Sequence, residues 1–357
     1  MSKIAVIGGG IFGTVAALEL AAVGHEVTIF EKEELILSKG TKNSQNRLHL
    51  GLHYPRDLDT ARQSVTGFQS FQNRFPNSVD LDFPNYYALA LKDSKTDLSN
   101  FLKFANEAKI DIKEVQMDYL KDLGINPEDY AGIWLCNEGV IDISILRSLI
   151  QDEIKKSTVK ILTKTEIVHA ESNGSWHLWD QDHRVSKFDL VFRCTYGSDR
   201  MTINQTDHKI RNYEFHKTAI LNVELNQPRF GFTIIDGDFL TILPDGKSKN
   251  SLVYAPSIST LLRSEGINYP EEWDTLSEAE FAVLCIKLSE RVEKWTPGVR
   301  INKVNGAMLA VRSIQPNVSD TDRRTSSIVS ISDNFYDVWS GKIDHCVDLS
   351  RQMLDLS

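Results

Sequence analysis

The chain of 357 residues is long enough for two lobes of ordinary size, and its composition, 41% hydrophobic and 25% charged, is that of a globular protein. A net charge of −9 argues against nucleic acid or an anionic membrane as the main partner, because a basic footprint is missing. No apolar run is long enough to span a bilayer, and no cleavable signal pattern follows the apolar N-terminus. The scattered cysteines Cys136, Cys194, Cys285 and Cys346 indicate reduced thiols, so we expect a cytoplasmic protein without a disulfide framework or a zinc site.

The first 31 residues carry the most specific pattern in the chain. A β-branched run over residues 3–7 predicts a buried strand, alanines and leucines at helical spacing predict a helix over 14–23, and residues 25–30 predict a second strand. Between the first strand and the helix lies a glycine turn of the form Gly-x-Gly-x-x-Gly. Strand, turn, helix and strand in this order predict a dinucleotide-binding unit, and the alternative is an ordinary glycine-rich turn in an α/β protein.

Each glycine of this turn has a separate mechanical role. The first allows a tight turn from strand to helix, the second lets backbone N–H groups approach a pyrophosphate, and the third lets helix and strand pack closely. Glu31 follows the second strand, where a carboxylate accepts hydrogen bonds from a ribose diol and repels a 2′-phosphate, which disfavours NADP. The cofactor contacts expected from this unit are Gly8, Gly10, Ile11, Phe12, Gly13, Glu31 and Lys32.

Residues 47–56 form the second informative stretch, after a polar and turn-rich loop over 38–46. Polar and leucine positions alternate here, so on a strand His49 and His53 would share a polar face with a glycine in its middle. We therefore predict a strand over 46–54 whose polar face meets the flat ring of a flavin, with His49 or His53 near the reactive edge. The alternative is an edge strand whose histidines face solvent. A metal site is disfavoured, because no carboxylate or cysteine flanks the histidines at ligand spacing.

The rest of the chain mixes strand and helix patterns. Helices are predicted over 57–75, 97–108, 143–155, 275–295 and from 343 to 354. Strands are predicted over 86–91, 159–168, 175–179, 188–192, 216–225, 231–235, 238–243, 251–255, 329–332 and 336–339. Asp142 is a candidate cap for the helix that follows it.

Two small-residue turns follow predicted strands near the middle and the end of the chain. Residues 194–197 suit a second approach to the cofactor, as expected at the end of a strand in an α/β sheet. Residues 340–343 precede the last helix, whose N–H groups could polarise the carbonyl edge of a flavin. Cys194 is expected to be a buried structural thiol, because no base is specified nearby for a nucleophile.

These places together resemble the signature positions of the D-amino-acid-oxidase-like, or DAO, family of FAD-dependent oxidoreductases, which includes glycine oxidase and L-2-hydroxyglutarate dehydrogenase. The resemblance involves residues 8–31, 46–54, 139–142, 195–197 and 340–342. It implies an α/β fold, with a Rossmann-type FAD-binding lobe and an interleaved α+β substrate lobe that carries an antiparallel sheet. It assigns residues 1–83, 135–212 and 304–357 to a discontinuous FAD-binding domain, and 84–134 and 213–303 to the substrate domain.

The resemblance also implies site residues. Further FAD contacts are expected from Asn46, Arg47, Leu48, Thr195, Gly197, Gly341, Lys342 and Ile343. Many family members carry a Gly-x-Arg element whose arginine reaches the substrate, and Arg312 is the best match, with Arg56 as a second anion anchor. The planar guanidinium suits bidentate capture of a carboxylate, although a structural arginine is the alternative. The candidate proton acceptors are His49, His53 and Tyr54.

The predicted protein is thus an FAD-dependent oxidase or dehydrogenase that removes a hydride from the C–N or C–OH carbon of a small amino- or hydroxy-acid-like metabolite. Amine and alcohol substrates make the same demands, so the sequence does not separate them. Two alternatives stay open. One is a flavin-dependent monooxygenase of a small metabolite, which would need NAD(P)H, and the other is a flavin-binding protein without redox turnover.

Overall fold

The computed structural model describes residues 1–197, 200–204, 212–316, 318 and 320–357. Its strands are β1 (Lys3–Ile7), β2 (Glu26–Phe30), β3 (Arg47–Leu48), β4 (Val79–Asp80), β5 (Asn85–Ala90), β6 (Ile112–Glu114), β7 (Tyr130–Cys136), β8 (Gly139–Ile141), β9 (Lys160–Leu162), β10 (Ile167–Ser172), β11 (Trp176–Asp180), β12 (Val185–Phe188), β13 (Leu190–Arg193), β14 (Thr202–Asn204), β15 (Tyr213–Leu225), β16 (Gly231–Ile235), β17 (Thr241–Pro244), β18 (Ser251–Tyr254), β19 (Thr260–Gly266), β20 (Ile301–Ile314), β21 (Ser327–Ser332) and β22 (Phe335–Trp339). Its α-helices are α1 (Ile11–Ala22), α2 (Leu58–Arg74), α3 (Leu98–Glu107), α4 (Ile143–Lys156), α5 (Pro256–Ser259), α6 (Glu278–Trp295) and α7 (Cys346–Asp355). Short 3-10 helices cover Pro76–Ser78, Met117–Leu123, Pro127–Asp129, Glu271–Asp274 and Ile343–His345.

Within the described residues the strands form sheets of six, four, nine and three members. The six-stranded one, called here the parallel sheet, has the order β21-β22-β13-β1-β2-β9, and only β21 runs antiparallel to its neighbour. The nine-stranded one, called here the large sheet, has the order β19-β15-β18-β17-β16-β5-β7-β6, with β20 paired to β15. The smaller sheets are β12-β11-β10-β14 and β3-β8-β4.

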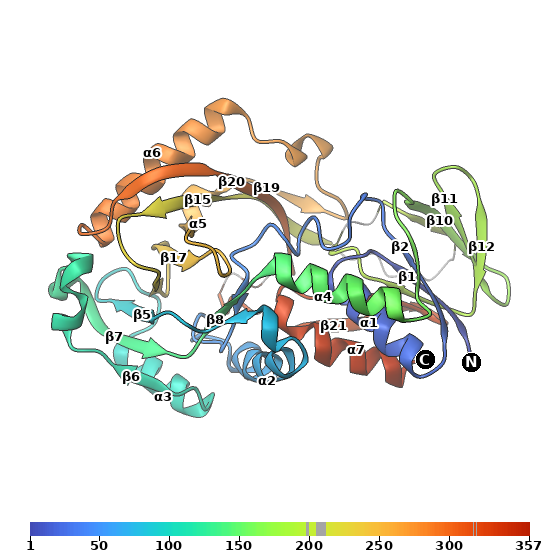
Figure 1. The fold of residues 1–357 in the computed structure, drawn as a ribbon, viewed down its shortest axis with the longest axis horizontal. Coiled ribbons are helices and arrows are strands. Elements are labelled where there is room, and N and C mark those ends of the chain that lie inside the picture. Colours follow the sequence, from blue (N-terminus) through green and yellow to red (C-terminus); the bar gives the residue numbers. More distant parts are fainter. Residues whose placement is uncertain (198–199, 205–211, 317, 319) are drawn as a thin grey trace.

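The parallel sheet is covered on both faces. Ile4 and Val6 of β1 point to one face and pack in a core with α1, α4 and α7, which Figure 1 shows side by side below the strands. Ala5 and Ile7 point to the other face and pack against the four-stranded sheet. A central strand buried on both faces explains why the first strand reads as a continuous apolar run. The predicted Rossmann-type unit is confirmed.

The large sheet forms the second lobe. Its strands pair antiparallel except for β16 and β5, and the long strands β15 and β20 pair along most of their length. Figure 1 shows these two strands extending from α6 toward the parallel sheet. Leu284, Leu288 and Val292 of α6 pack into the apolar core of this sheet. The predicted fold class is confirmed, whereas the exact domain ranges stay a prediction.

The strand predicted over 46–54 is wrong beyond Leu48. The strand β3 ends there, and the chain turns at Gly51, whose φ of +95° lies in the left-handed region that favours glycine. A Cβ at Gly51 would lie 2.7 Å from Cα of Ala61, so the turn packs directly on α2. The alternating pattern therefore reflects a turn that places both polar and apolar residues inside the protein.

Two other predicted strands are divided. The stretch 159–168 contains β9 and β10, which belong to different sheets and are separated by Lys164 at a φ of +52°. The stretch 188–192 spans the end of β12 and the start of β13. The helix predicted from 275 begins at Glu278, because Ser277 and Glu280 form a capping box. The predicted cap is confirmed, since the Asp142 carboxylate accepts the N–H of Ile145 at 3.0 Å.

A buried ion pair ties the three-stranded sheet to the large sheet. The Arg47 guanidinium donates to Glu138 at 2.8 Å and to the Thr233 hydroxyl at 2.8 Å, and it also contacts the Tyr87 hydroxyl. The second carboxylate oxygen of Glu138 accepts the N–H of Leu50 at 2.7 Å. The Arg47 and Glu138 side chains are only 3% and 0% exposed. Burial alone would raise the pKa of Glu138, but Arg47 holds it well below the usual range.

We expect the substitution Glu138→Gln to lower the free energy of unfolding by about 3–5 kcal/mol, because it leaves the buried Arg47 charge without a counterion. Urea unfolding measures this change. The control is Lys155→Ala, which removes an exposed pair with Asp152 and should cost about 1 kcal/mol at most. Equal losses in the two variants would contradict a structural role for the buried pair.

Candidate functional site

A cavity of about 760 Å³ lies between the two lobes. One wall is formed at the carboxyl ends of β1, β2 and β13, and the other by the inner face of β15 and β20. Ligands of open α/β sheets bind at such strand ends. The predicted residues that line the cavity are Gly8, Gly10, Ile11, Phe12, Glu31, Lys32, Asn46, Arg47, His49, His53, Tyr54, Arg56, Thr195, Arg312, Gly341, Lys342 and Ile343.

Three predicted cofactor residues lie outside this lining. Leu48 is fully buried in the core that contains α1 and α4. Gly13 packs against the preceding turn, since a Cβ on it would lie 2.0 Å from the carbonyl oxygen of Gly8. Gly197 packs against Ser313 of β20. These residues therefore shape the walls of the cavity from behind.

The glycine turn and Glu31 form one end of the cavity. Glu31 accepts the N–H of Gly9 at 2.6 Å and that of Glu33 at 2.8 Å, while burial raises the pKa of its carboxyl group. Gly10 caps α1 in an extended conformation, and a Cβ there would meet only the Thr41 hydroxyl, at 3.6 Å. The N-terminal end of α1 therefore has room for a ligand group that approaches closely from the cavity.

The three predicted proton acceptors meet near the middle of the cavity. The rings of His49 and His53 are 6.3 Å apart, and each lies within 6 Å of the Tyr54 ring, centre to centre. Burial lowers the pKa of His49 to about 3 and that of His53 well below its ordinary value, and it raises the pKa of Tyr54. All three groups are therefore neutral near pH 7.

Lys342 is a buried lysine that lines the same cavity. Its Nζ lies 3.8 Å from the centre of the Tyr54 ring, and none of the residues described by the structure accepts a hydrogen bond from it. Burial lowers the pKa of Lys342 to about 7. Asp344 is buried nearby without a hydrogen-bond donor to its carboxylate in the described part of the chain, and burial raises its pKa to about 7. A buried ammonium group without a hydrogen-bond acceptor is suited to a polar ligand.

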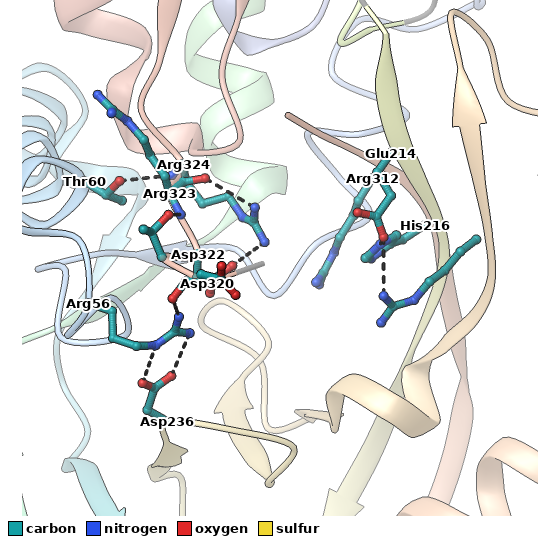
Figure 2. Close-up of polar contacts among 12 residues, drawn as sticks. Arg56, Thr60, Glu214, His216, Asp236, Arg312, Asp320, Asp322, Arg323 and Arg324 are labelled. Carbon is teal, nitrogen blue, oxygen red and sulfur yellow. Dashed lines mark hydrogen bonds and ion pairs between the residues drawn. The ribbon is translucent and has the colours of Figure 1, made fainter. Parts of the chain in front are cut away.

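The two predicted anion anchors differ in their charge balance. Arg56 donates to both carboxylate oxygens of Asp236, at 2.7 and 3.2 Å, so its charge is already neutralised. Arg312 donates to the Tyr254 hydroxyl at 3.0 Å, and no carboxylate of a described residue lies within 4.0 Å of it. Figure 2 shows Arg312 and the pair of Arg56 with Asp236 on opposite sides of the view. Only Arg312 keeps an uncompensated charge.

Sequence reasoning missed Glu214 and His216, which also line the cavity. His216 begins the strand predicted over 216–225 and Glu214 lies just before it, and no chemical role is predicted for either residue from the sequence. The available signal was the spacing of two polar residues two positions apart at the start of β15, which places both on one face of the sheet.

The surroundings of Cys194 disfavour a nucleophilic thiolate, since burial raises the pKa of its thiol.

The residues present fit FAD. The open glycine turn suits a pyrophosphate, and the Glu31 carboxylate at the same end of the cavity suits a ribose. Lys342 offers an amino group without a hydrogen-bond partner among the described residues elsewhere in the cavity. A cavity that begins at a glycine turn of this kind and continues past charged side chains is the arrangement expected of an FAD-dependent oxidoreductase. The chain belongs to the DAO family, because the family model for FAD-dependent oxidoreductases matches residues 3–322. FAD as cofactor and the enzyme class are thereby confirmed.

The curated proteins similar to this chain include two FAD-dependent monooxygenases. FPY4 of Fusarium mangiferae is 25% identical over 362 residues, which is 99% of this chain and 90% of the relative. The kojA protein of Aspergillus flavus is 24% identical over 382 residues, which is 99% of this chain and 85% of the relative. These identities are low, so the substrate does not follow from them.

Solved structures with the same fold include glycine oxidase from Geobacillus kaustophilus. It has a TM-score of 0.79 at 12% identity, over 99% of this chain and 94% of that one. The FAD-bound L-alpha-glycerophosphate oxidase from Mycoplasma pneumoniae has a TM-score of 0.77 at 17% identity, over 99% and 94% of the two chains. These likenesses show the fold.

The glycine turn offers a paired test. Gly10→Ala should leave the melting temperature of the FAD-free protein unchanged, because the new Cβ has room, but it should weaken FAD binding by crowding the pyrophosphate. Gly13→Ala should lower the free energy of unfolding by about 1–3 kcal/mol, and with it the melting temperature, because the new Cβ would overlap the backbone carbonyl of Gly8. Thermal unfolding and FAD titration of both variants check this. Unchanged FAD affinity in Gly10→Ala would contradict the pyrophosphate site.

Proposed function

We propose that this protein oxidises a small amino- or hydroxy-acid-like metabolite whose carboxylate is held by Arg312. The observation that carries the proposal is the uncompensated guanidinium of Arg312 inside the cavity. A partly buried charge without a counterion is a favourable place for an anion, and a substrate carboxylate would bind it through charge-assisted hydrogen bonds. The anchor would hold the α-carbon in a fixed place, which is the main requirement for hydride removal.

FAD, when bound, supplies the acceptor for the hydride and its two electrons. We propose that the turn at Gly8 and Gly10 holds its pyrophosphate and that Glu31 holds its ribose. Lys342 would then lie near the ring, where an ammonium group favours negative charge on a reduced flavin. His49 and His53 remain candidate proton acceptors because they line the same cavity. Tyr54 is disfavoured in this role, because burial raises the pKa of its hydroxyl, which therefore keeps its proton. The predicted domain ranges are part of this proposal, with the large sheet forming the substrate side.

Tyr254 supports the anchor in two ways. Its hydroxyl accepts a hydrogen bond from Arg312 at 3.0 Å, and its ring lies 4.7 Å from the central carbon of the guanidinium. Stacking of this kind fixes the plane of the guanidinium while leaving other N–H groups available. The arrangement favours bidentate capture of a planar carboxylate over a loose electrostatic attraction.

A second candidate function is monooxygenation of a small metabolite, favoured by the names of the two curated relatives. Such an enzyme would be reduced by NAD(P)H before it reacts with oxygen.

The four free cysteines agree with the predicted cytoplasmic location, which stays a prediction. Among the described residues no helix is long and apolar enough to cross a membrane, and no group of His, Cys, Asp and Glu could hold a metal ion.

Anaerobic reduction of the bound flavin separates the two functions. The purified protein is mixed with a panel of amino and hydroxy acids, and separately with NADPH and NADH, while the flavin absorbance is followed. Rapid bleaching by one of the acids supports the proposal. Bleaching by a nicotinamide donor and by none of the acids would overturn it in favour of a monooxygenase.

Arg312→Ala should raise the acid concentration needed for half-maximal flavin reduction by about 30-fold or more. This corresponds to the loss of about 2 kcal/mol from a charge-assisted contact. Flavin content should stay at the wild-type level, whereas Glu31→Ala should lower it. Arg351→Ala, which changes an exposed arginine on α7, serves as the control. Equal flavin loss in the Arg312 and Glu31 variants would remove Arg312 from the substrate role.

A further inference from the structure

A histidine and a carboxylate form a close pair on the cavity face of β15. Nε2 of His216 lies 2.6 Å from Oε1 of Glu214, and both side chains line the cavity. Figure 2 shows this pair next to Arg312. The His216 side chain is 13% exposed and the Glu214 side chain 30%, so the histidine is the more buried of the two. Glu214 also accepts a hydrogen bond from Arg263 at 3.3 Å.

The strand register sets His216 beside the substrate anchor. His216 and Arg312 are directly opposed residues of the antiparallel strands β15 and β20. Side chains of such a pair start from Cβ atoms about 4.5–5.5 Å apart on the same face of the sheet. The amino or hydroxyl group of an α-substituted acid is only one carbon away from its carboxylate. A carboxylate held by Arg312 therefore brings that group into the neighbourhood of His216.

The pairing with Glu214 also fixes the tautomer of the imidazole. A carboxylate only accepts hydrogen bonds, so Nε2 carries the hydrogen and Nδ1 keeps its lone pair. No residue in the described ranges donates a hydrogen bond to Nδ1. The charged groups that face the ring are Glu214 on its own strand, Arg263 on β19 and Arg312 on β20. Burial lowers the pKa of His216 and Glu214 opposes that change, so the ring is neutral but able to accept a proton.

His49 has a longer contact to a carboxylate than His216. Its Nδ1 lies 3.5 Å from Oε1 of Glu138, and that carboxylate also binds the Arg47 guanidinium at 2.8 Å. Burial is the main cause of the lowered pKa values of His49 and His53, and the nearby cations Lys342 and Arg47 lower both further. Glu214 also has an arginine partner, since Arg263 lies 3.3 Å from it. His216 is therefore distinguished by its 2.6 Å contact to a carboxylate and by its place opposite Arg312.

We propose that His216, oriented by Glu214, accepts the proton of the substrate's amino or hydroxyl group during oxidation, an assignment that rests on the proposed function. The α-carbon would give up its hydrogen as a hydride, with both electrons of the C–H bond, and FAD, when bound, would supply the acceptor. The lone pair of the heteroatom forms the C=N or C=O bond, and the proton of the heteroatom moves to Nδ1 of His216. Glu214 is a positioning residue that stabilises the imidazolium.

The test compares His216→Asn with the wild-type protein in anaerobic flavin reduction by the best acid of the panel. The wild-type rate should rise with pH as one group loses its proton. In His216→Asn this rise should disappear, and the rate at its plateau should fall by about 100-fold or more. Binding of acetate, measured by calorimetry, should stay unchanged because Arg312 is intact. A variant that keeps both the rise and the rate would overturn the assignment.

Glu214→Gln tests the positioning role with a conservative change. The amide oxygen can still accept the hydrogen bond from Nε2, but the negative charge that favours the imidazolium is gone. The pH at which the rate rises should therefore move downward, whereas an unmoved profile would overturn the role of Glu214. His169→Asn on β10, outside the cavity lining, is the control and should keep the wild-type profile. If no acid bleaches the wild-type protein, the proposed function fails and this assignment falls with it, whereas failure in the His216 variant alone leaves the proposed function standing.

Discussion

The buried pair of Arg47 and Glu138 is the interaction on which the site geometry depends. It joins a two-residue strand to the large sheet through Tyr87 and Thr233, and the same carboxylate holds the N–H of Leu50. The turn that follows has no backbone pairing with a neighbouring strand, because β3 ends at Leu48. A fully desolvated ion pair is costly to form but also costly to break on one side, so it specifies one arrangement of this turn strongly. His49, His53 and Tyr54 owe their shared position to that constraint.

The cations of the cavity discussed above fall into two groups, those that have a carboxylate partner and those that have none among the described residues. Arg47 and Arg56 each hold a carboxylate, and they join segments of the chain. Lys342 has no hydrogen-bond acceptor among the described residues, and Arg312 has no carboxylate partner there. Since proteins rarely leave charge without compensation inside a cavity, these two cations are the ones that we propose to contact a bound group. The residues that stabilise the fold and those that meet ligands can thus be told apart by their partners rather than by residue type.

Sequence reasoning found what is local and missed what depends on long-range pairing. The nucleotide-binding unit lies within the first 31 residues, so its turn, helix and acid were all predictable. The alternating pattern after Arg47 was misread as a longer strand, because the partner that bends the chain, Glu138, lies 91 residues away. His216 was overlooked for the same reason. Its place opposite Arg312 follows from the pairing register of β15 and β20, and the sequence of one strand does not contain that register.

The position of the charged groups on β15 and β20 bears on how this fold accommodates different substrates. Glycine oxidase and L-alpha-glycerophosphate oxidase share the fold at 12% and 17% identity, so the scaffold persists while most side chains differ. Function therefore resides in a few residues presented by that scaffold rather than in the scaffold itself. Under the proposed function, Arg312 and His216 are such residues, and they project from the long paired strands β15 and β20. The residues that would contact the substrate then lie on one sheet face, so that a substitution there would change the substrate without a change of the fold.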